Sequence, residues 1–233
     1  MGHRLATFVV ANTQFGRAQL VPEIKLRLAI DSHGIFQAAE YLERAPEARF
    51  PPYWAFAWPG GQAIARYVLD NAPLFAGRRV VDIGSGSGIG AIAAAMAGAA
   101  HVLAADIDPV AEVAIGLNAA ANGCSGRIST TTRDLLGEIP EADLILLSDI
   151  VYEPELALRV GVFLERAAGA GRVLLMGDRL SARNPAGQLD ELARYPAPLM
   201  PALIDDDDEQ GRVWRVGGRR RMAAACTEFE HAQ

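Results

Sequence analysis

Short apolar runs alternate with longer segments of helical periodicity along the middle of the chain. Patterns typical of buried strands occur at residues 79–83, 101–105, 128–131, 143–147 and 172–176. Helical periodicity marks residues 61–71, the segment from a glycine-rich turn to about residue 98, residues 109–122 and residues 154–168. Strands that alternate with helices in this way form parallel βαβ units. We therefore predict an α/β fold built on a doubly wound sheet.

The two ends of the chain follow other patterns. Residues 22–29 alternate apolar and charged positions, which fits either a short strand or a helical turn, and residues 34–44 have helical periodicity. Near the other end, residues 199–204 and 212–216 read as two strands, and the acidic residues 205–209 between them favour a solvated turn. We expect these two strands to form an antiparallel pair at one edge of the sheet.

Composition excludes more than it assigns. A length of 233 residues suits one domain, and a formal net charge of −6 argues against a general nucleic-acid binder. The two cysteines, Cys124 and Cys226, lie far apart and are predicted to be reduced thiols, and the four histidines lack the spacing of metal ligands. The sequence shows no signal peptide and no apolar run long enough to span a bilayer. We expect a soluble monomer without a metal.

The strongest local signal is the glycine-rich turn that follows the first buried strand. Glycines at Gly84, Gly86 and Gly88 let a ligand lie against bare backbone, beyond the carboxyl ends of the strands. The next strand ends in Asp106, about 20 residues further on, where a carboxylate can accept hydrogen bonds from two ribose hydroxyls. The spacing predicts a nucleoside-containing cofactor. Asp82, just before the glycines, is expected to orient the turn or to approach an ammonium group of that cofactor.

The spacing of the glycines also separates cofactor classes. The register is GxGxG, whereas dinucleotide sites use GxGxxG, and position 89 is an isoleucine. No nucleoside triphosphate loop of the GxxxxGK[ST] type is present in the sequence. The pattern therefore favours S-adenosylmethionine over NAD. Asp134 either reaches the adenine amino group or is an acidic residue of a surface loop, and Asp108 is better explained as a helix cap than as a ribose partner.

The fourth strand predicts the side of the site that receives the acceptor. It ends in Ser148 and Asp149, with Tyr152 shortly after, and we assign Ser148 to the cofactor site. Asp149 could hold an incoming ammonium and Tyr152 could stabilise it by cation–π attraction, although Asp149 could also be a simple strand-end cap. Upstream, a proline-bounded aromatic segment carries Phe56, which we expect in the core, and Trp58, which we expect against the cofactor.

With these segments assembled, the chain resembles the seven-strand (class I) protein-lysine methyltransferases, and more narrowly the family that methylates lysines of the electron transfer flavoprotein beta subunit. The glycine turn marks only the superfamily, whereas the aromatic segment and the Asp-x-x-Tyr motif are more specific. The matching pieces are residues 22–28, 53–63, 66–67, 69–70, 81–88, 105–109, Asn118, 149–152, 177–178 and 213–214.

The resemblance implies a seven-stranded class I methyltransferase domain at residues 59–217, with an N-terminal extension at 1–58 and a tail at 218–233. It implies that Trp58, the three glycines and Asp106 touch S-adenosylmethionine, and that Asp149 and Tyr152 serve the acceptor lysine. S-adenosylhomocysteine would be the second product. The resemblance does not carry over Asp134, and it is loose after Gly177. The match begins almost at the first residue, which favours a cytoplasmic protein.

Two other readings stay open. The acceptor could be another protein, such as a ribosomal protein, or a small-molecule amine. The segment FGTGxHxTT of ribosomal-protein methyltransferases is absent from the sequence, however, and AFAWPGGQA stands in its place. A cofactor-binding module without catalysis, or an NAD(P)-binding protein, would require a different glycine register or the loss of Asp106, Asp149 or Tyr152, and neither is seen.

Overall fold

A seven-stranded sheet forms the centre of the molecule. The computed structural model describes residues 2–43, 50–179, 189–197 and 210–217. The strands lie in the order β5-β4-β3-β6-β7-β9-β8, and β3 to β7 are parallel. Their bounds are β3 Arg79–Ile83, β4 His101–Ala105, β5 Ile128–Thr131, β6 Leu144–Ser148, β7 Val173–Asp178, β8 Leu189–Pro196 and β9 Gln210–Val216. The doubly wound α/β prediction is confirmed.

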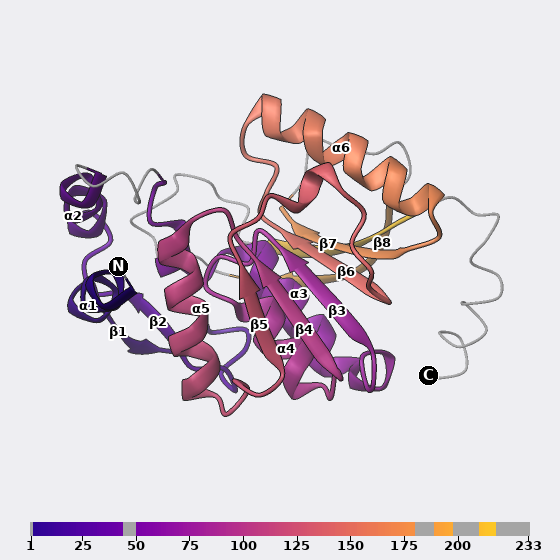
Figure 1. The fold of residues 1–233 in the computed structure, drawn as a ribbon. Helices are drawn as coiled ribbons and strands as arrows, with labels where there is room; N and C mark the ends of the chain where they lie inside the picture. Colours follow the sequence, from indigo (N-terminus) through magenta and orange to yellow (C-terminus); the bar gives the residue numbers. More distant parts are fainter. Residues whose placement is uncertain (1, 44–49, 180–188, 198–209, 218–233) are drawn as a thin grey trace.

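Helices cover both faces of this sheet (Figure 1). Alternate strand residues such as Val80 and Leu146 pack on one face with α3 and α4, and residues such as Val81 and Leu147 pack on the other face with α6. The helices are α3 Pro59–Asp70, α4 Ile89–Met96, α5 Pro109–Ala121 and α6 Pro154–Gly169. Each parallel strand therefore ends at the same edge of the sheet, where the loops that follow the strands gather.

Helix α5 begins as the sequence predicts. Asp108 is its N-cap, because its side chain accepts a hydrogen bond from the backbone N–H of Val110, and Pro109 occupies the first helical position.

The N-terminal segment forms a small unit beside α5. It contains α1 Gly2–Asn12, β1 Thr13–Gly16, β2 Leu26–Ala29 and α2 Gly34–Glu43, and β1 and β2 pair as an antiparallel hairpin. The ambiguous residues 22–29 therefore contain a strand. Figure 1 shows these elements together at the α5 end of the sheet, and α1 packs against α5. The sequence patterns indicated neither α1 nor β1.

The antiparallel pair at the sheet edge exists, but its first strand was placed wrongly. The strand is β8 at Leu189–Pro196, whereas residues 199–204, the acidic turn at 205–209 and the tail at 218–233 lie outside the described residues. Among the described residues, strand β8 pairs with β9 alone, and it carries Asp190, Glu191 and Arg194. Charged residues are common on edge strands and hide them from a search for apolar runs.

Helix α3 lies unusually close to the strands at its N-terminus. A Cβ atom added to Gly60 would lie 2.4 Å from the carbonyl oxygen of Gly177 in β7, and one added to Gly211 in β9 would lie 2.3 Å from that of Pro59. Only glycine fits at these contacts, and the backbone amides at the start of α3 are thereby brought to the carboxyl edge of the sheet.

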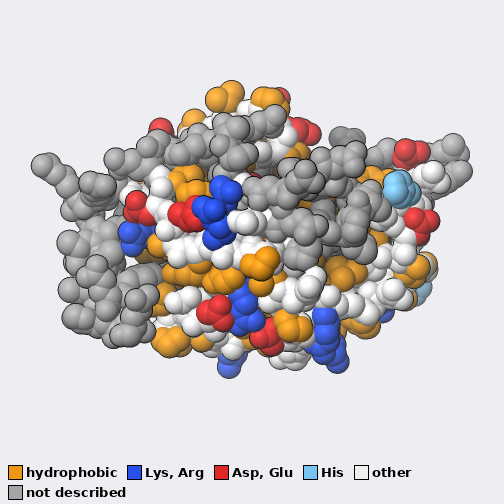
Figure 2. Space-filling model, turned by 180° about the vertical axis from the view of Figure 1, so that it is seen from behind, with side chains coloured by type: hydrophobic (Ala, Val, Ile, Leu, Met, Phe, Trp, Pro, Cys, Tyr) orange, Lys and Arg blue, Asp and Glu red, His pale blue; other side chains and the backbone are white. Residues whose placement is uncertain are grey.

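The surface carries both signs of charge. On the face seen in Figure 2, outside the grey atoms, basic and acidic side chains lie interspersed with apolar ones. None of the helices in the described ranges is both long and apolar enough to cross a membrane. Those ranges also contain no cluster of three or more side chains suited to a metal ion.

Candidate active site

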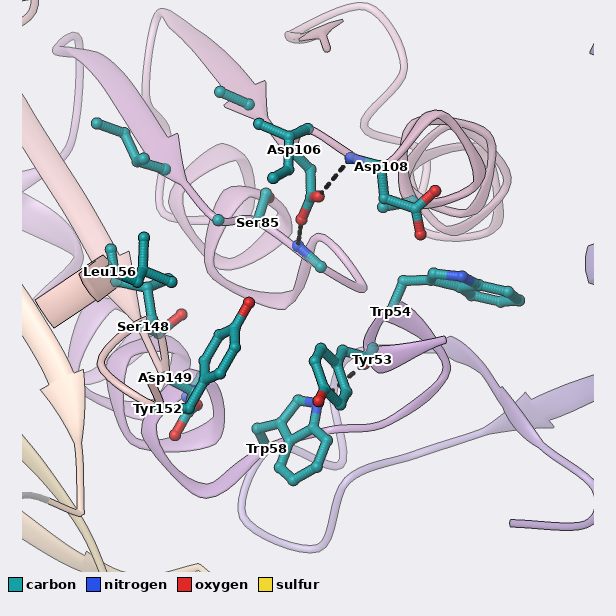
Figure 3. Close-up of a pocket in the computed structure, with 18 of the residues that line it drawn as sticks. Tyr53, Trp54, Trp58, Ser85, Asp106, Asp108, Ser148, Asp149, Tyr152 and Leu156 are labelled. Atoms are coloured by element: carbon teal, nitrogen blue, oxygen red, sulfur yellow. Dashed lines mark hydrogen bonds between the residues drawn. The ribbon is translucent and has the colours of Figure 1, made fainter. Parts of the chain in front are cut away.

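A cavity of about 720 Å³ opens at the carboxyl ends of β3, β4, β6 and β7. Its lining includes the glycine turn, Asp106 and Asp108 on one side, and Ser148, Asp149 and Tyr152 on the other. The aromatic segment before α3 closes the cavity from a third direction (Figure 3). A ligand crevice outside the carboxyl ends of parallel strands is the general rule for such folds.

The glycine turn is a bare backbone surface. Gly84 has a φ of +68°, and a Cβ atom added there would lie 2.3 Å from Cγ2 of Ile150. A side chain at this position would meet both a strained backbone and a buried neighbour. The turn is tied to the next strand because the N–H of Gly84 donates to the carbonyl of Ala105 at 2.9 Å. A ligand can therefore approach the main chain closely.

Asp106 is held in place by backbone donors. Its Oδ2 accepts from the N–H of Gly86 at 2.8 Å, and its Oδ1 accepts from the N–H of Asp108 at 3.0 Å (Figure 3). Each carboxylate oxygen keeps a second lone pair, so the carboxylate can still accept hydrogen bonds from a pair of hydroxyls. Burial raises the pKa of Asp106, and these backbone bonds oppose that shift.

Asp82 lies beneath the turn and is not among the residues that line the cavity. Its Oδ2 accepts from Ser85 Oγ at 2.6 Å and from the N–H of Ala91 at 3.0 Å, so it ties the turn to α4. Its Oδ1 is buried and has no hydrogen-bond partner among the described residues. Burial raises the pKa of Asp82 to about 6. The structure thus gives Asp82 a role in shaping the turn.

Asp108 and Asp134 both cap local structure at the rim of the cavity. Asp108 starts α5, and burial raises its pKa to about 7. Asp134 accepts from the N–H of Leu136 at 3.0 Å and pairs with Arg159, and it is exposed. Asp134 lines the cavity, so both alternatives considered for it stay compatible with its position.

Asp149 caps a helix from a distant part of the chain. Helix α3 has Trp58 as its N-cap residue, and Trp58 makes no side-chain capping bond. The carboxylate of Asp149 accepts instead from the N–H of Gly60 at 3.1 Å and from that of Gly61 at 2.7 Å. Anions are stabilised at helix N-termini by such donors and by the helix dipole. The two oxygens keep further lone pairs, and the residue faces the cavity.

The backbone at Asp149 adopts a strained, left-handed conformation while the side chain caps α3. Its φ of +51° is the only positive value among the described residues other than glycine. Such conformations persist where the surroundings hold them, and they cluster at functional sites. Burial and the negative charge of Asp178 raise the pKa of Asp149 to about 7. Asp178, at the end of β7, also lines the cavity, so two carboxylates border this side.

Three aromatic side chains form the wall beside Asp149. The ring of Tyr53 meets that of Tyr152 edge to face at 5.5 Å and that of Trp58 at 5.7 Å. The Nε1–H of Trp58 donates to the carbonyl of Tyr53 at 2.9 Å. Figure 3 shows Tyr152 between Ser148 and Asp149 on one side and Tyr53 and Trp58 on the other. Phe56 is buried, as expected.

Tyr53 and Asp178 are two of the cavity residues to which the sequence patterns gave no role. Tyr53 belongs to the aromatic segment that was singled out as a whole, and the resemblance included Asp178 without a function. Their positions beside Asp149 depend on contacts across the chain, which no local spacing reveals. The remaining predicted residues, with the exception of Asp82 and Gly88, line one cavity.

Comparisons with known proteins agree with this geometry. The chain is 38% identical over 218 residues to the electron transfer flavoprotein beta subunit lysine methyltransferase of Rattus norvegicus, which covers 91% of this chain and 84% of the relative. The protein of the same name from Danio rerio is 37% identical over 219 residues, covering 91% of this chain and 83% of the relative. Residues 64–160 match the family model described as ribosomal protein L11 methyltransferase.

Solved structures support the fold alone. A putative RNA methyltransferase from Pyrococcus horikoshii has a TM-score of 0.53 at 13% identity, covering 77% of this chain and 95% of that one. Magnesium protoporphyrin IX methyltransferase from Synechocystis, solved with S-adenosylmethionine bound, has a TM-score of 0.52 at 18% identity, covering 68% of this chain and 79% of that one. The chain therefore shares its overall fold with these two structures.

Proposed function

Because the chain belongs to the family of electron transfer flavoprotein beta subunit lysine methyltransferases, we propose that its substrate is a lysine of the electron transfer flavoprotein beta subunit. The chain is an S-adenosylmethionine-dependent methyltransferase of the class I fold, and lysine methylation is the activity of the family. One observation carries the proposal. The glycine turn and Asp106, which suit a nucleoside cofactor, line the same cavity as Asp149 and Tyr152, which suit an amine acceptor.

The residues present fit the cofactor. The glycine turn offers bare backbone, and Asp106 offers two oxygens that are already oriented by main-chain donors. We assign Gly84, Gly86, Asp106, Trp58 and Ser148 to direct cofactor binding, with Asp134 at the rim. Gly88 and Asp82 contribute to the cofactor site by shaping the turn, Gly88 where it packs over Ile115 and Asp82 from beneath. S-adenosylmethionine supplies an electrophilic methyl group on a sulfonium, and S-adenosylhomocysteine leaves.

The acceptor side has the groups that an amine acceptor needs. The lysine nitrogen must be neutral and lie in line with the bond that breaks, so its position decides the rate. Asp149 and Asp178 can receive the ammonium, and the faces of Tyr152 and Tyr53 can stabilise its charge. The raised pKa of Asp149, about 7, suits a carboxylate that takes up a proton near neutral pH.

We further propose that the enzyme acts as a monomer in the cytoplasm, with residues 59–217 as the catalytic domain and residues 1–58 packed on it. The contacts of α1 with α5, and of Tyr53 with Tyr152, support this division. The formal net charge of −6 argues against nucleic acid as the substrate.

Intact-mass spectrometry tests the substrate. Purified electron transfer flavoprotein beta subunit is incubated with the enzyme and S-adenosylmethionine. We expect mass increments of one or more methyl groups on lysine, formed about 100-fold more slowly with Asp149→Ala and at an unchanged rate with Asp190→Asn, a charge-removing change on the edge strand β8. An unmodified subunit, with an enzyme that binds S-adenosylhomocysteine, would refute this substrate.

The match of residues 64–160 to the ribosomal protein L11 methyltransferase family favours one competing substrate. Ribosomal protein L11 is therefore included in the same experiment. Methylation of that protein with an unmodified flavoprotein subunit would replace the proposed substrate but keep the reaction.

A further inference from the structure

Two asparagines, Asn118 in helix α5 and Asn122 at its C-cap, lie one helical turn apart and face the N-terminal hairpin. Oδ1 of Asn118 accepts from the N–H of Arg27 at 2.7 Å, and Oδ1 of Asn122 accepts from the N–H of Lys25 at 2.9 Å. Four helical residues rise about 6 Å and two strand residues about 6.6 Å, so the two repeats match. The two side chains thereby give hydrogen-bond acceptors to backbone N–H groups along the edge of β2, where another strand would otherwise pair.

The two asparagines differ at their other end. Nδ2 of Asn118 donates to the carbonyl of Ser87 in the glycine turn at 2.8 Å. Nδ2 of Asn122 donates to the carbonyls of Lys25 and Asn118, and so binds no part of the turn. Asn118 is completely buried, and Ser87 lines the cavity. One amide thus joins the N-terminal hairpin to the backbone that faces the cofactor.

The turn needs support at this point. Gly88, the next residue, has a φ of +81° and packs over Ile115, whose Cγ2 would lie 3.2 Å from an added Cβ. Ser87 is buried, and a buried backbone carbonyl without a hydrogen bond destabilises the folded protein. The Oδ1 atom of the same side-chain amide of Asn118 also accepts a hydrogen bond from the backbone N–H of Arg27. A change in the path of either segment therefore acts on the other.

We propose that Asn118 is a positioning residue for the cofactor, which fixes the glycine turn at Ser87 and couples cofactor binding to the hairpin β1–β2. The hairpin then stabilises the position of the glycine turn in the cofactor site, whether or not it also contacts a substrate. The inference requires that the cavity binds S-adenosylhomocysteine, but it does not depend on which substrate is methylated.

Two matched variants test this role. Asn118→Asp keeps an oxygen for Arg27 but turns a carboxylate oxygen toward the carbonyl of Ser87, and Asn122→Asp makes the same chemical change one turn away. Calorimetric titration of the unmodified enzyme with S-adenosylhomocysteine comes first, since its binding there belongs to the proposed function. We expect Asn118→Asp to weaken this binding about tenfold or more and Asn122→Asp to change it less than about twofold.

Thermal unfolding of both variants separates positioning from stability. A role limited to stability predicts that the loss of affinity follows the loss of melting temperature in both proteins. Equal affinities in the two variants, at whatever melting temperature, would overturn the proposal. We expect Asn118→Asp to lose more stability than Asn122→Asp, because Asn118 is completely buried and Asn122 is half-buried, so both affinities are measured well below the lower melting temperature. The loss of affinity should be confined to Asn118→Asp even where both variants are fully folded.

Hydrogen exchange of the unmodified enzyme provides a test that needs no variant to fold. Saturation with S-adenosylhomocysteine should slow the exchange of the Arg27 amide by about threefold or more, and should slow that of Lys25 less, because only Arg27 shares Asn118 with the turn. Exchange at Arg27 that does not respond to the cofactor would also overturn the proposal.

Discussion

The two sides of the cavity are built in different ways. On the cofactor side, acidic side chains bind backbone N–H groups nearby in the sequence: Asp108 binds Val110, and Asp82 binds Ala91. On the acceptor side, Asp149 binds the N–H of Gly61, 88 residues away. The cofactor side is largely the product of one βαβ unit, β3-α4-β4, whereas the acceptor side is assembled from segments that meet only in the folded protein.

This difference predicts a division of labour. A change that disturbs how α3 docks on β7 should impair methyl transfer and leave the cofactor bound. A change at the carboxyl end of β3 or β4 should weaken cofactor binding and leave methyl transfer by the cofactor-bound enzyme largely intact. The link through Asn118 is where this separation is expected to fail, because it joins the N-terminal hairpin to the turn.

The largest effect is expected from Asp149→Ala. The change removes a carboxylate from the acceptor side and leaves the N–H groups of Gly60 and Gly61 without their cap. Loss of a charged hydrogen-bonding group costs about 1.5–3 kcal/mol, so we expect kcat to fall about 100-fold. Stopped assays at saturating substrate give kcat, and calorimetry gives the affinity for S-adenosylhomocysteine.

The comparison predicts an affinity within about threefold of the unmodified enzyme for this variant, which is below 1 kcal/mol. Asp149→Asn is the matched control, because its amide oxygen can still accept one of the two N–H bonds of α3. Asp149→Asn should therefore keep more thermal stability than Asp149→Ala while losing similar activity. A large loss of cofactor affinity in both variants would contradict the division between the two sides.

Asp106→Ala should give the opposite pattern with a somewhat smaller effect. The variant loses the carboxylate that faces the cofactor and leaves the N–H groups of Gly86 and Asp108 without an acceptor. We expect the dissociation constant for S-adenosylhomocysteine to rise about 30-fold, equivalent to about 2 kcal/mol. At saturating cofactor, kcat should recover most of its value. A kcat that stays low at saturation would instead give Asp106 a part in transfer.

The same difference explains what could be predicted from the sequence. The glycines and Asp106 belong to one βαβ unit, so their spacing alone places them together, and the strand bounds at residues 79–83 and 101–105 are confirmed. The fixed geometry of such units leaves little freedom for the ligand-facing backbone. The expectation that Asp108 caps α5 is also confirmed. It could be predicted because Asp108 and the helix that it begins are adjacent in the sequence.

The acceptor side could be predicted only in part. The end of β6 predicted that Asp149 faces the crevice, but its contact with the start of α3 depends on the close approach of Gly60 to Gly177. Nor could an apolar pattern reveal that Tyr53 meets Tyr152, because that contact requires the N-terminal segment to fold back over the cavity. Strand β8 was missed because its charged residues hide it.

Tyr53→Ala should have a moderate effect, larger on the acceptor side than on the cofactor side. The variant loses the ring that meets both Tyr152 and Trp58. Aromatic pairs and cation–π contacts are each worth about 0.5–1.5 kcal/mol, so we expect the KM for the protein substrate to rise about tenfold. Tyr53→Phe keeps the ring and should stay near the unmodified enzyme. Initial rates over a range of substrate concentrations distinguish KM from kcat, and an unchanged KM would remove Tyr53 from the acceptor wall.

The smallest effect concerns the two helix caps and the dependence of stability on pH. Burial raises the pKa of Asp108 on the cofactor side to about 7, and burial together with the charge of Asp178 raises that of Asp149 to about 7. The folded state then binds protons more tightly than the unfolded chain, whose aspartates have a pKa of about 4. The stability from this source is present below pH about 4 and is lost as the pH rises to about 7.

Urea unfolding between pH 5 and pH 8 measures this slope. Asp108→Asn should flatten it by about 1 kcal/mol per pH unit between pH 5 and pH 7, since the asparagine does not ionise. The exposed Asp190→Asn should leave it unchanged. Asp149→Asn should flatten the slope and also reduce the protection of the α3 amides from hydrogen exchange, because Asp149 caps a helix from another part of the chain and Asp108 caps its own. If Asp108→Asn and Asp149→Asn left the α3 amides equally protected from exchange, Asp149 would not join the acceptor side to α3. The contrast between a local cofactor side and an assembled acceptor side would then lose its main support.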